Sequence, residues 1–510
     1  MLFESVKESE KANIALNDLS QERTWLELDL RVQAIATFLK QECFVSEGDH
    51  IALQIGNRVE FIEVMLAGII SGVWVTPINT HLTRNESAYI LENCDAKVLF
   101  HDSDHRDLVD SLEDVRYIEV DSLSSSLDLN SEFEISAKSS AGGTMLYTSG
   151  TTGRPKGVKR NKPDTLGESL KRMRAGGELF GLVGAGPHLV TGPLYHAAPM
   201  LFAIYDLLNG APVVIMPKWD AQLFGELVEA QNISTTHLVP TMFVRLLDAY
   251  KNQEFHYDLS SLRLVLHGAA PIAKSTKEDM LAWWGDVLVE YWGGSEAGVT
   301  TLVNSADWRN HPGTVGKPLD HFEVYVGDEQ GNALSEEKGG IAEPLKGLLF
   351  CRHKQLSQVF EYYKDPAKTQ KAHPMPYTFC IGDIGWVGED GFVYLSDRES
   401  NMIISGGVNI YPAEVEQALM AHPSILDCVV FGSQDKEWGE RVNAIIQLRP
   451  SLKESELTEG DLKNYLKERI AKYKIPRDFR FVDEIPRTPT GKIKLSSLHE
   501  LVADGFSDSH

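Results

Sequence analysis

Two kinds of hydrophobic pattern alternate along the first part of the chain. In some stretches apolar side chains recur at helical spacing, and between these stretches stand short, continuous apolar runs bounded by turn residues. The pattern predicts helices at 26–42, 59–70 and 86–91 and strands at 51–55, 73–75 and 97–100. Helices that alternate with short buried strands need crossover connections, so we expect mainly parallel sheets flanked by helices.

The alternation resumes after an acidic, serine-rich stretch at 111–138, which we expect to be a solvated surface excursion. Further strand units are predicted at 190–199, where the strand leads into a helix, and at 211–216, 237–242 and 262–271. The C-terminal segment has the pattern of a small α/β domain, with a helix that begins at Pro412, strands at 428–431, 442–448 and 479–481, and a helix at 459–471.

Length and charge narrow the class of protein. At 510 residues the chain exceeds what one hydrophobic core usually serves, so two or more domains are expected. The net charge of −24 argues against a nucleic-acid partner and against attraction to anionic membranes. A phosphate-binding site must therefore take its positive charge from the residues of the site itself, because the protein as a whole is negative.

The sequence also indicates a compartment. The N-terminus lacks a basic region followed by an apolar core, so no secretory signal is expected. The most apolar stretch, 64–78, is interrupted by glycines and a proline and is shorter than the roughly 20 residues of a membrane span, so no integral membrane segment is expected. The five cysteines are scattered without metal-ligand spacing, which is typical of reduced thiols. These features predict a cytoplasmic protein without disulfides or structural zinc.

A run of glycines and small hydroxyl residues at 147–158 carries the strongest chemical signal. It reads Tyr-Thr-Ser-Gly-Thr-Thr-Gly-Arg-Pro-Lys-Gly-Val. The glycines allow backbone N–H groups to face an anion, and the hydroxyls and Lys156 add donors for phosphate oxygens. The run is not the Walker form, because no glycine stands five residues before a Gly-Lys-Ser/Thr. A flexible linker is the alternative, but a linker has no need of Lys156, so we expect a polyphosphate-binding loop.

Further motifs follow this loop in order along the chain. They are Tyr195-His196, Gly268-Ala269-Ala270, Trp292-Gly293-Gly294-Ser295-Glu296, Gly382-Asp383, Arg398, Ser405-Gly406-Gly407 and Thr490-Gly491-Lys492. With the loop at 147–158, they resemble the motifs of the adenylate-forming superfamily, in its acyl-CoA synthetase and fatty-acid–CoA ligase branch. The resemblance covers nearly the whole chain, although the segment 331–349 departs from the family pattern. It implies an α/β fold with a large N-terminal adenylation domain at 1–397 and a small, mobile α/β C-terminal lid at 398–510.

The resemblance also implies roles for individual residues. It assigns catalysis to Lys492, Thr148, Glu296 and His196. Glu296 is the expected ligand of Mg²⁺, because a polyphosphate site needs a hard oxygen ligand for that ion. The residues expected to hold ATP or CoA are Ser149, Gly150, Thr151, Thr152, Lys156, Gly268, Ala269, Trp292, Ser295, Asp383, Arg398, Gly406, Gly407 and Lys474.

Within this set, the resemblance suggests contacts for the nucleotide and for CoA. Trp292 would stack on adenine, and Asp383 would accept hydrogen bonds from both ribose hydroxyls. Gly406 and Gly407 would leave a groove for the thiol arm of CoA. Lys474 would hold the nucleotide end of CoA, and an ordinary solvated helix end is the alternative for it.

The implied activity is ATP-dependent acyl-CoA synthesis from a small-molecule carboxylic acid, through an acyl-adenylate, with ATP, Mg²⁺ and CoA. Three alternatives stay open: transfer of the acyl group to a carrier protein, an oxygen-dependent luciferase-type reaction, and a non-enzymatic nucleotide-binding role. A non-enzymatic role would leave Lys492 without a purpose.

Four residues of the sequence indicate the character of the acyl substrate. His196, Val239, Met242 and Gly293 suggest an apolar slot with no obvious cation for a second carboxylate. We therefore expect a fatty or other hydrophobic acid, with aryl and sterol-like acids also open. A homodimer stays open as the assembly of this chain.

Overall fold

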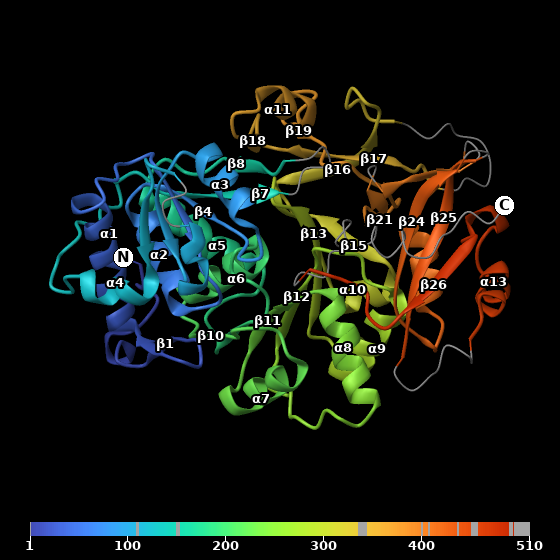
Figure 1. The fold of residues 1–510 in the computed structure, drawn as a ribbon, viewed down its shortest axis with the longest axis horizontal. Helices are drawn as coiled ribbons and strands as arrows, with labels where there is room; N and C mark the ends of the chain where they lie inside the picture. Colours follow the sequence, from blue (N-terminus) through green and yellow to red (C-terminus); the bar gives the residue numbers. More distant parts are fainter. Residues whose placement is uncertain are drawn as a thin grey trace.

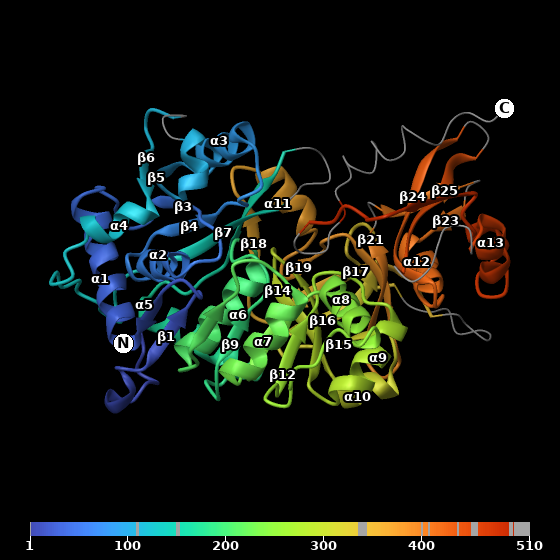
Figure 2. The same ribbon diagram turned by 60° about the horizontal axis from the view of Figure 1, so that its bottom comes forward.

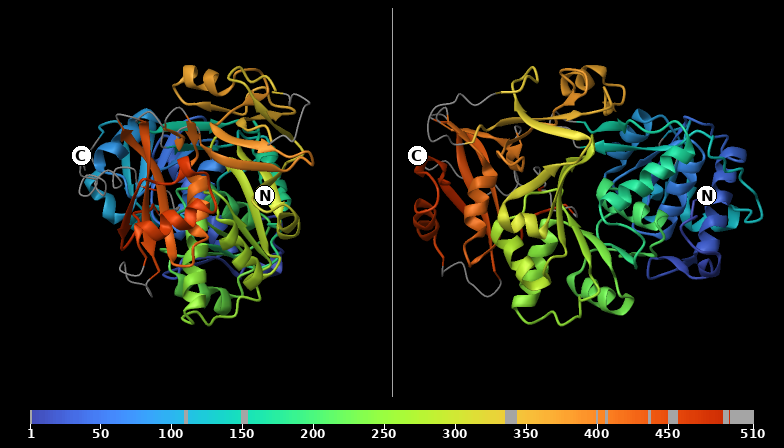
Figure 3. Two further views of the ribbon diagram at one scale, coloured as in Figure 1. Left: turned by 90° about the vertical axis from the view of Figure 1, so that its right-hand side faces the viewer. Right: turned by 180° about the vertical axis from the view of Figure 1, so that it is seen from behind.

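The computed structural model describes residues 2–108, 112–148, 154–334, 344–398, 401–405, 408–435, 438–449, 457–488 and 493. The N-terminal helices and the C-terminal strands lie at opposite ends of an elongated molecule (Figure 1), and Figure 3 shows the same arrangement from behind. The predicted α/β fold class is confirmed: a large α/β body is followed by a smaller α/β unit.

One sheet of the body is built mainly from the N-terminal elements. Among the described residues it has seven strands, in the order β18-β8-β7-β4-β3-β5-β6. Its strands are β3 (His50–Gln54), β4 (Trp74–Pro77), β5 (Ala96–His101), β6 (Arg116–Glu119), β7 (Gly143–Thr148), β8 (Lys156–Arg160) and β18 (Phe360–Tyr362). The run β7-β4-β3-β5-β6 is parallel, as the alternating pattern predicted, whereas β8 and β18 add antiparallel strands at one edge.

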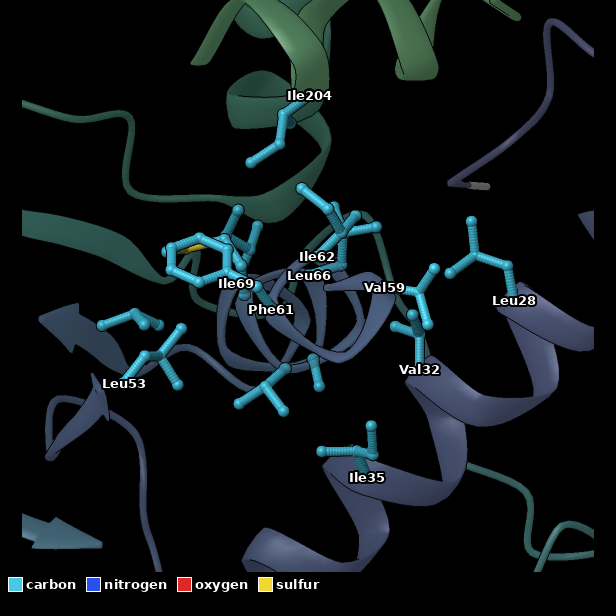
Figure 4. Close-up of a cluster of buried hydrophobic side chains, with 14 of the residues drawn as sticks. Leu28, Val32, Ile35, Leu53, Val59, Phe61, Ile62, Leu66, Ile69 and Ile204 are labelled. Carbon is cyan, nitrogen blue, oxygen red and sulfur yellow. The ribbon is translucent and has the colours of Figure 1, made fainter. Parts of the chain in front are cut away.

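The helices beside this sheet are α1 (Trp25–Gln41), α2 (Val59–Ile70), α3 (Arg84–Asn93) and α4 (Val120–Ser126). Every residue of α2 is buried, because its apolar side chains surround the helix axis. Figure 4 shows the packing: α1 presents Leu28 and Val32 to α2 from one side, and Leu53 of β3 lies on another side.

The second sheet runs through the middle of the molecule. Its parallel part follows the order β13-β12-β11-β9-β10-β1, and β2 pairs antiparallel with β1 at the edge. The strands are β1 (Ile14–Asn17), β2 (Glu22–Thr24), β9 (His188–Val190), β10 (Val213–Ile215), β11 (Thr235–Leu238), β12 (Leu264–His267) and β13 (Leu288–Gly294). The helices that connect and cover them are α5 (Leu166–Leu179), α6 (Ala197–Leu208), α7 (Ala221–Gln231), α8 (Pro240–Lys251) and α9 (Lys274–Trp284).

From β13 onward the same sheet becomes antiparallel, which the expectation of mainly parallel sheets did not include. A tight hairpin pairs Gly294 with Gly298, and such a short connection can join only antiparallel strands. The elements of this part are β14 (Gly298–Asn304), α10 (Ser305–Asn310), β15 (Thr314–Pro318), β16 (Phe322–Gly327), β17 (Gly347–His353), α11 (Pro366–Ala372), β19 (Thr378–Phe379), β20 (Asp383–Val387) and β21 (Val393–Arg398).

The C-terminal unit has its own sheet and its own hydrophobic core. The elements are β22 (Ile403–Ser405), β23 (Val408–Ile410), α12 (Pro412–Met420), β24 (Ile425–Asp435), β25 (Gly439–Leu448), α13 (Glu459–Lys467), a 3-10 turn at Lys472–Lys474 and β26 (Asp478–Val482). Leu419, Ile446 and Leu462 belong to a buried cluster made within this unit. Figure 2 shows the unit at one end of the molecule. The separate core supports a domain border near 398, which stays a prediction.

Two local expectations were wrong. The stretch 111–138 is not simply a surface excursion, because β6 and α4 lie within it and bury Ile118, Val120 and Leu123. Three apolar side chains at suitable spacing are enough to anchor an acidic segment on the sheet. The predicted helix 459–471 ends earlier, at Lys467. Among the described helices, none has both the length and the apolar character that a membrane crossing requires.

Candidate active site

A cavity of about 1130 Å³ lies where the two sheets of the body meet the C-terminal segment. It opens beyond the carboxyl ends of β9, β11 and β12, which is where ligands commonly bind in parallel sheets. The predicted site residues that line it are Thr148, His196, Ala269, Ser295, Glu296 and Arg398. The structure therefore brings together residues from widely separated motifs.

The predicted phosphate loop stands between two paired strands. Thr148 at the end of β7 pairs with Lys156 at the start of β8, so the loop begins and ends at one place beside the cavity. The Lys156 Nζ lies 2.9 Å from the Asp365 Oδ2, and this ion pair lowers the pKa of Asp365. Ser149, Gly150, Thr151 and Thr152 lie outside the described residues, so their assignment to phosphate stays a prediction.

Glu296, the predicted metal ligand, belongs to a polar cluster on the cavity wall. Tyr362 donates a hydrogen bond of 3.1 Å from its hydroxyl to the Glu296 Oε1. The Lys368 Nζ lies 4.0 Å from the centre of the Tyr362 ring. Burial lowers the pKa of Lys368, which the Glu296 carboxylate opposes. Sequence reasoning assigned no role to Tyr362 or Lys368.

Glu296 also fits a magnesium ion. No cluster of three or more His, Cys, Asp or Glu side chains in the described part of the chain could hold a metal by protein ligands alone. Mg²⁺ commonly binds one or two carboxylates together with substrate phosphates. The Glu296 Oε2 has no hydrogen-bond partner among the described residues, and Glu296 lines the same cavity as Thr148. The donor set therefore suits an ion that the phosphates of a nucleotide help to hold.

Asp383 has contacts that the sequence did not reveal. Its Oδ2 accepts a hydrogen bond of 2.8 Å from the Trp292 Nε1, and its Oδ1 lies 3.2 Å from the Arg398 Nε. Burial raises the pKa of Asp383, and the charge of Arg398 opposes the rise. Each carboxylate oxygen has a second lone pair, so acceptance of ribose hydroxyls by Asp383 stays a prediction.

The structure places Trp292 differently from the expectation. Its side chain is only 5% exposed and packs in a buried cluster with Val158 and Phe360. Its neighbours Tyr291 and Gly293 line the cavity instead. Trp292 thus positions Asp383 from behind the cavity wall, and stacking on adenine would require the buried ring to become accessible.

The structure gives a different reason for a glycine at position 268 from the one expected. A Cβ at Gly268 would lie 2.7 Å from the Tyr291 backbone oxygen and 2.8 Å from the Tyr291 ring. The missing side chain therefore makes room for Tyr291, whose hydroxyl lies 2.9 Å from the His237 Nε2. Ala269 is the residue of this motif that reaches the cavity, and it adopts a left-handed φ of 67°.

In the C-terminal unit, Thr488 lines the cavity. Its neighbour Arg487 forms a two-pronged ion pair with Asp427, at 2.6 and 2.7 Å, and pairs through the backbone with Ile493. Lys492, Gly406 and Gly407 lie outside the described residues, so their roles stay predictions. Lys474 is engaged elsewhere: its Nζ lies 2.6 and 2.7 Å from the two carboxylate oxygens of Glu414.

The cavity wall carries two arginines that sequence reasoning did not single out. His196, at the start of α6, lines the cavity with Val239, Met242 and Gly293, as predicted. Arg160 and Arg172 also line this cavity, which the predicted nucleotide site shares, so the expectation of an acyl slot without a cation for a second carboxylate stays a prediction. These arginines come from β8 and α5, outside the motifs that carried the resemblance.

Comparison with known proteins identifies the family. Residues 2–354 match the model of the AMP-binding enzyme family, and residues 414–492 match the model of the AMP-binding enzyme C-terminal domain. The chain is 30% identical to a 2-succinylbenzoate–CoA ligase of Bacillus velezensis over 493 residues, which is 96% of this chain and 95% of that protein. It is 27% identical to a long-chain-fatty-acid–CoA ligase of Mycobacterium tuberculosis, over 89% of this chain and 88% of that one.

A solved structure shows the same architecture. The o-succinylbenzoate CoA synthetase of Bacillus subtilis, in complex with its acyl-adenylate intermediate, superposes with a TM-score of 0.79 at 27% identity, over 99% of this chain and 96% of that chain. The chain thus belongs to the AMP-binding enzyme family, as an AMP-forming acid–thiol ligase whose co-substrates are ATP, with Mg²⁺, and CoA.

Proposed function

We propose that this enzyme activates a hydrophobic carboxylic acid at the cavity described above and transfers the acyl group to CoA. The observation that carries the proposal is the meeting of three segments on one cavity wall. Thr148 comes from the phosphate-loop hairpin, Glu296 from the β13–β14 turn and Thr488 from the C-terminal unit. A site of this composition can hold a polyphosphate, a carboxylate and a mobile cation together.

In the first step the acid's carboxylate oxygen attacks the α-phosphorus of ATP, and the bond from that phosphorus to the diphosphate breaks. No general base is required, because the nucleophile is already an anion. Positioning and charge neutralisation therefore supply most of the acceleration. We assign the departing diphosphate to the loop that Thr148 and Lys156 flank, and the bridge between carboxylate and α-phosphate to Lys492. Mg²⁺ held at Glu296 would neutralise phosphate charge.

In the second step the CoA thiol attacks the carbonyl carbon of the acyl-adenylate and releases AMP. We propose that the C-terminal unit rotates between the two steps, withdrawing Lys492 and presenting the Ser405-Gly406-Gly407 segment. One hinge then serves both half-reactions. Two apolar aromatic groups on the cavity wall, Phe180 and Phe202, support a hydrophobic acyl group of considerable size.

The test is a diphosphate-release assay with ATP and Mg²⁺ over a panel of alkyl, aryl and sterol-like acids, repeated with CoA and mass detection of the ester. The panel includes 2-succinylbenzoate and long-chain fatty acids, because relatives are named for them. We expect acid-dependent diphosphate release and, with CoA, an acyl-CoA ester. Release without a CoA ester would favour a carrier protein as the acceptor, and no release with any acid would refute the proposal.

A further inference from the structure

The polar cluster around Glu296 contains a lysine to which the proposed function gives no part. Lys368 lies in α11 and lines the large cavity together with Thr148 and Glu296. Its side chain is half-buried, and its Nζ lies 4.0 Å from the centre of the Tyr362 ring. The face of an aromatic ring attracts an ammonium group at this distance, so the ring holds the charge of Lys368 at the cavity wall.

The first turn of α11 fixes the backbone from which this side chain extends. The Asp365 Oδ1 accepts a hydrogen bond of 3.0 Å from the Lys368 backbone N–H and so caps the helix. The Thr369 hydroxyl accepts a hydrogen bond of 2.9 Å from the Tyr362 backbone N–H, which ties α11 to β18. The base of the Lys368 side chain is therefore set by bonds within residues 362–369, before any ligand binds.

The carboxylates near Lys368 are engaged with other groups. The Asp365 Oδ2 lies 2.9 Å from the Lys156 Nζ, at the end of the phosphate-loop hairpin. The Glu296 Oε1 accepts a hydrogen bond of 3.1 Å from the Tyr362 hydroxyl. Both carboxylates and the charge of Lys156 are within electrostatic reach of the Lys368 ammonium. In the part of the chain that the structure describes, no carboxylate lies within ion-pair distance of the Lys368 Nζ.

The charge balance of the site favours a phosphate partner for Lys368. Lys156 and Asp365 neutralise each other through their ion pair. A Mg²⁺ ion held at Glu296 would take up the charge of that carboxylate, and Lys368 would then lose the attraction of its other neighbouring anion. Burial already lowers the pKa of Lys368, so an ammonium without a counter-charge is costly at this position. A phosphate oxygen would relieve this cost through a charge-assisted hydrogen bond.

We propose that Lys368 binds the β- and γ-phosphates of ATP and stabilises the departing diphosphate in the first half-reaction. The inference deepens the proposed function and rests on it. In that step the acid's carboxylate oxygen forms a bond to the α-phosphorus, the bond from that phosphorus to the bridging oxygen breaks, and the diphosphate leaves with the electron pair. The negative charge that develops on the diphosphate is stabilised by the Lys368 ammonium. No diphosphate is present when the CoA thiol attacks the acyl-adenylate, so Lys368 has no part in the second half-reaction.

The test measures the two half-reactions separately in the variant Lys368→Gln. We expect kcat/KM for ATP in acid-dependent diphosphate release to fall about 10- to 100-fold, the size expected for one charge-assisted hydrogen bond. Conversion of supplied acyl-AMP to acyl-CoA should stay within about twofold of the wild type. Lys368→Arg keeps a cation and should recover part of the loss. Lys364→Gln is the matched control and should change neither half-reaction, because Lys364 is exposed and its Nζ pairs with the Asp95 Oδ1 at 2.8 Å.

Calorimetric titration with inorganic diphosphate and Mg²⁺ separates this inference from the proposed function. The wild type and Lys364→Gln should bind diphosphate equally, and Lys368→Gln should bind it about 10-fold or more weakly. Equal diphosphate binding by the wild type and Lys368→Gln, or an equal loss of both half-reactions in that variant, would overturn the role of Lys368 and leave the proposed function standing. Lys368-dependent binding of diphosphate without diphosphate release from any acid would support the phosphate contact and overturn the proposed function.

Discussion

At the scale of single residues, small side chains at this site serve packing as much as ligand contact. Gly268 stands in a motif that predicts a flat ring lying against the backbone. In the structure, however, Tyr291 occupies the space that a side chain at position 268 would need. Tyr291 in turn contacts His237, and both residues line the cavity. The geometry of the predicted nucleotide site therefore depends on a glycine that does not itself line the cavity.

Gly268→Ala should consequently destabilise the protein. The added Cβ would lie 2.7 Å from a backbone oxygen, which cannot move away as a flexible side chain could. We expect a loss of about 1–3 kcal/mol in the free energy of unfolding and weaker ATP binding. Thermal unfolding with and without ATP measures both. Gly460→Ala is the control, because its Cβ would meet only the Thr458 hydroxyl at 3.6 Å; equal behaviour of the two variants would contradict the argument.

Buried histidines make stability depend on pH. Burial lowers the pKa of His237 to about 3 and that of His267 well below its usual 6.5. Both rings stay neutral in the folded protein, whereas the unfolded chain takes up protons as the pH falls below about 6.5. Their contribution to stability is therefore complete above pH 6.5 and is lost as the pH falls toward the folded pKa, by about 1.4 kcal/mol per pH unit and ring.

Urea unfolding between pH 5 and pH 7 tests this dependence. His237→Gln should remove about one ring's share of the slope, whatever its effect on stability at pH 7. His256→Gln, at an exposed position, should leave the slope unchanged. A slope in His237→Gln equal to that of the wild type would show that His237 titrates normally in the folded state.

At the scale of elements, α2 is the clearest case of a helix that only its surroundings stabilise. It is buried on all sides, yet it carries two glutamates. The Glu63 Oε1 lies 2.6 Å from the Arg31 Nε and 2.8 Å from the Arg23 Nε, and the Glu63 side chain has no exposed surface. These ion pairs tie α2 to α1 and to β2.

Glu63→Ala should therefore be strongly destabilising. It leaves two poorly solvated guanidinium groups without their shared carboxylate, and breaking a buried ion pair in this way costs about 3–5 kcal/mol. We expect a large fall in the thermal midpoint or a loss of folded protein on expression. Glu226→Ala, on the exposed face of α7, is the control. A fall in midpoint no larger than that of the control would mean that the arginines find other partners.

At the scale of the whole molecule, the C-terminal unit touches the body away from the cavity as well as at Thr488. The Arg449 Nη1 lies 2.8 Å from the Asp248 Oδ1 of α8. A second ion pair joins the Arg245 Nη2 of α8 and the Glu484 Oε1 of the C-terminal unit at 4.0 Å. Partly exposed ion pairs are each worth little, so these contacts can hold one orientation of the unit without preventing another. That is the property a lid needs if it serves two half-reactions.

Lys492→Ala tests the moving lid. We expect at least a 100-fold loss of acid-dependent ATP–diphosphate exchange, because the variant lacks the cation between carboxylate and α-phosphate. The same variant should still convert supplied acyl-AMP to acyl-CoA, since Lys492 is withdrawn in that step. Lys494→Ala, close by in the sequence, is the control for both assays. Equal loss of the two half-reactions would count against a rotating lid.

The local pattern predicted most elements closely, and α2 was expected at the residues where it occurs. Helical and strand spacing are set within a few turns, so a sequence displays them directly. The antiparallel part after β13 and the burial of β6 and α4 were missed, because pairing partners and burial depend on segments far away in the chain.

The candidate site was likewise predicted in part: the motifs identified residues, but not the contacts between them. Motifs pointed to Thr148, Glu296, Asp383 and Arg398, and the structure gathers them around one region. They did not point to the contact of Trp292 with Asp383, or to the bond of Tyr362 to Glu296. These pairs are distant in sequence, and nothing in the local pattern at either residue records its partner.

The sequence by itself determined the α/β class, the order of the elements and the chemistry of ATP-dependent activation, because spacing and motif composition are local properties. Only the tertiary structure decided which side chains share the cavity wall. Arg160 and Arg172 belong to a strand and a helix with no shared motif, and folding places both on the wall that Thr148 and Glu296 also line, because packing joins segments that are distant in the sequence.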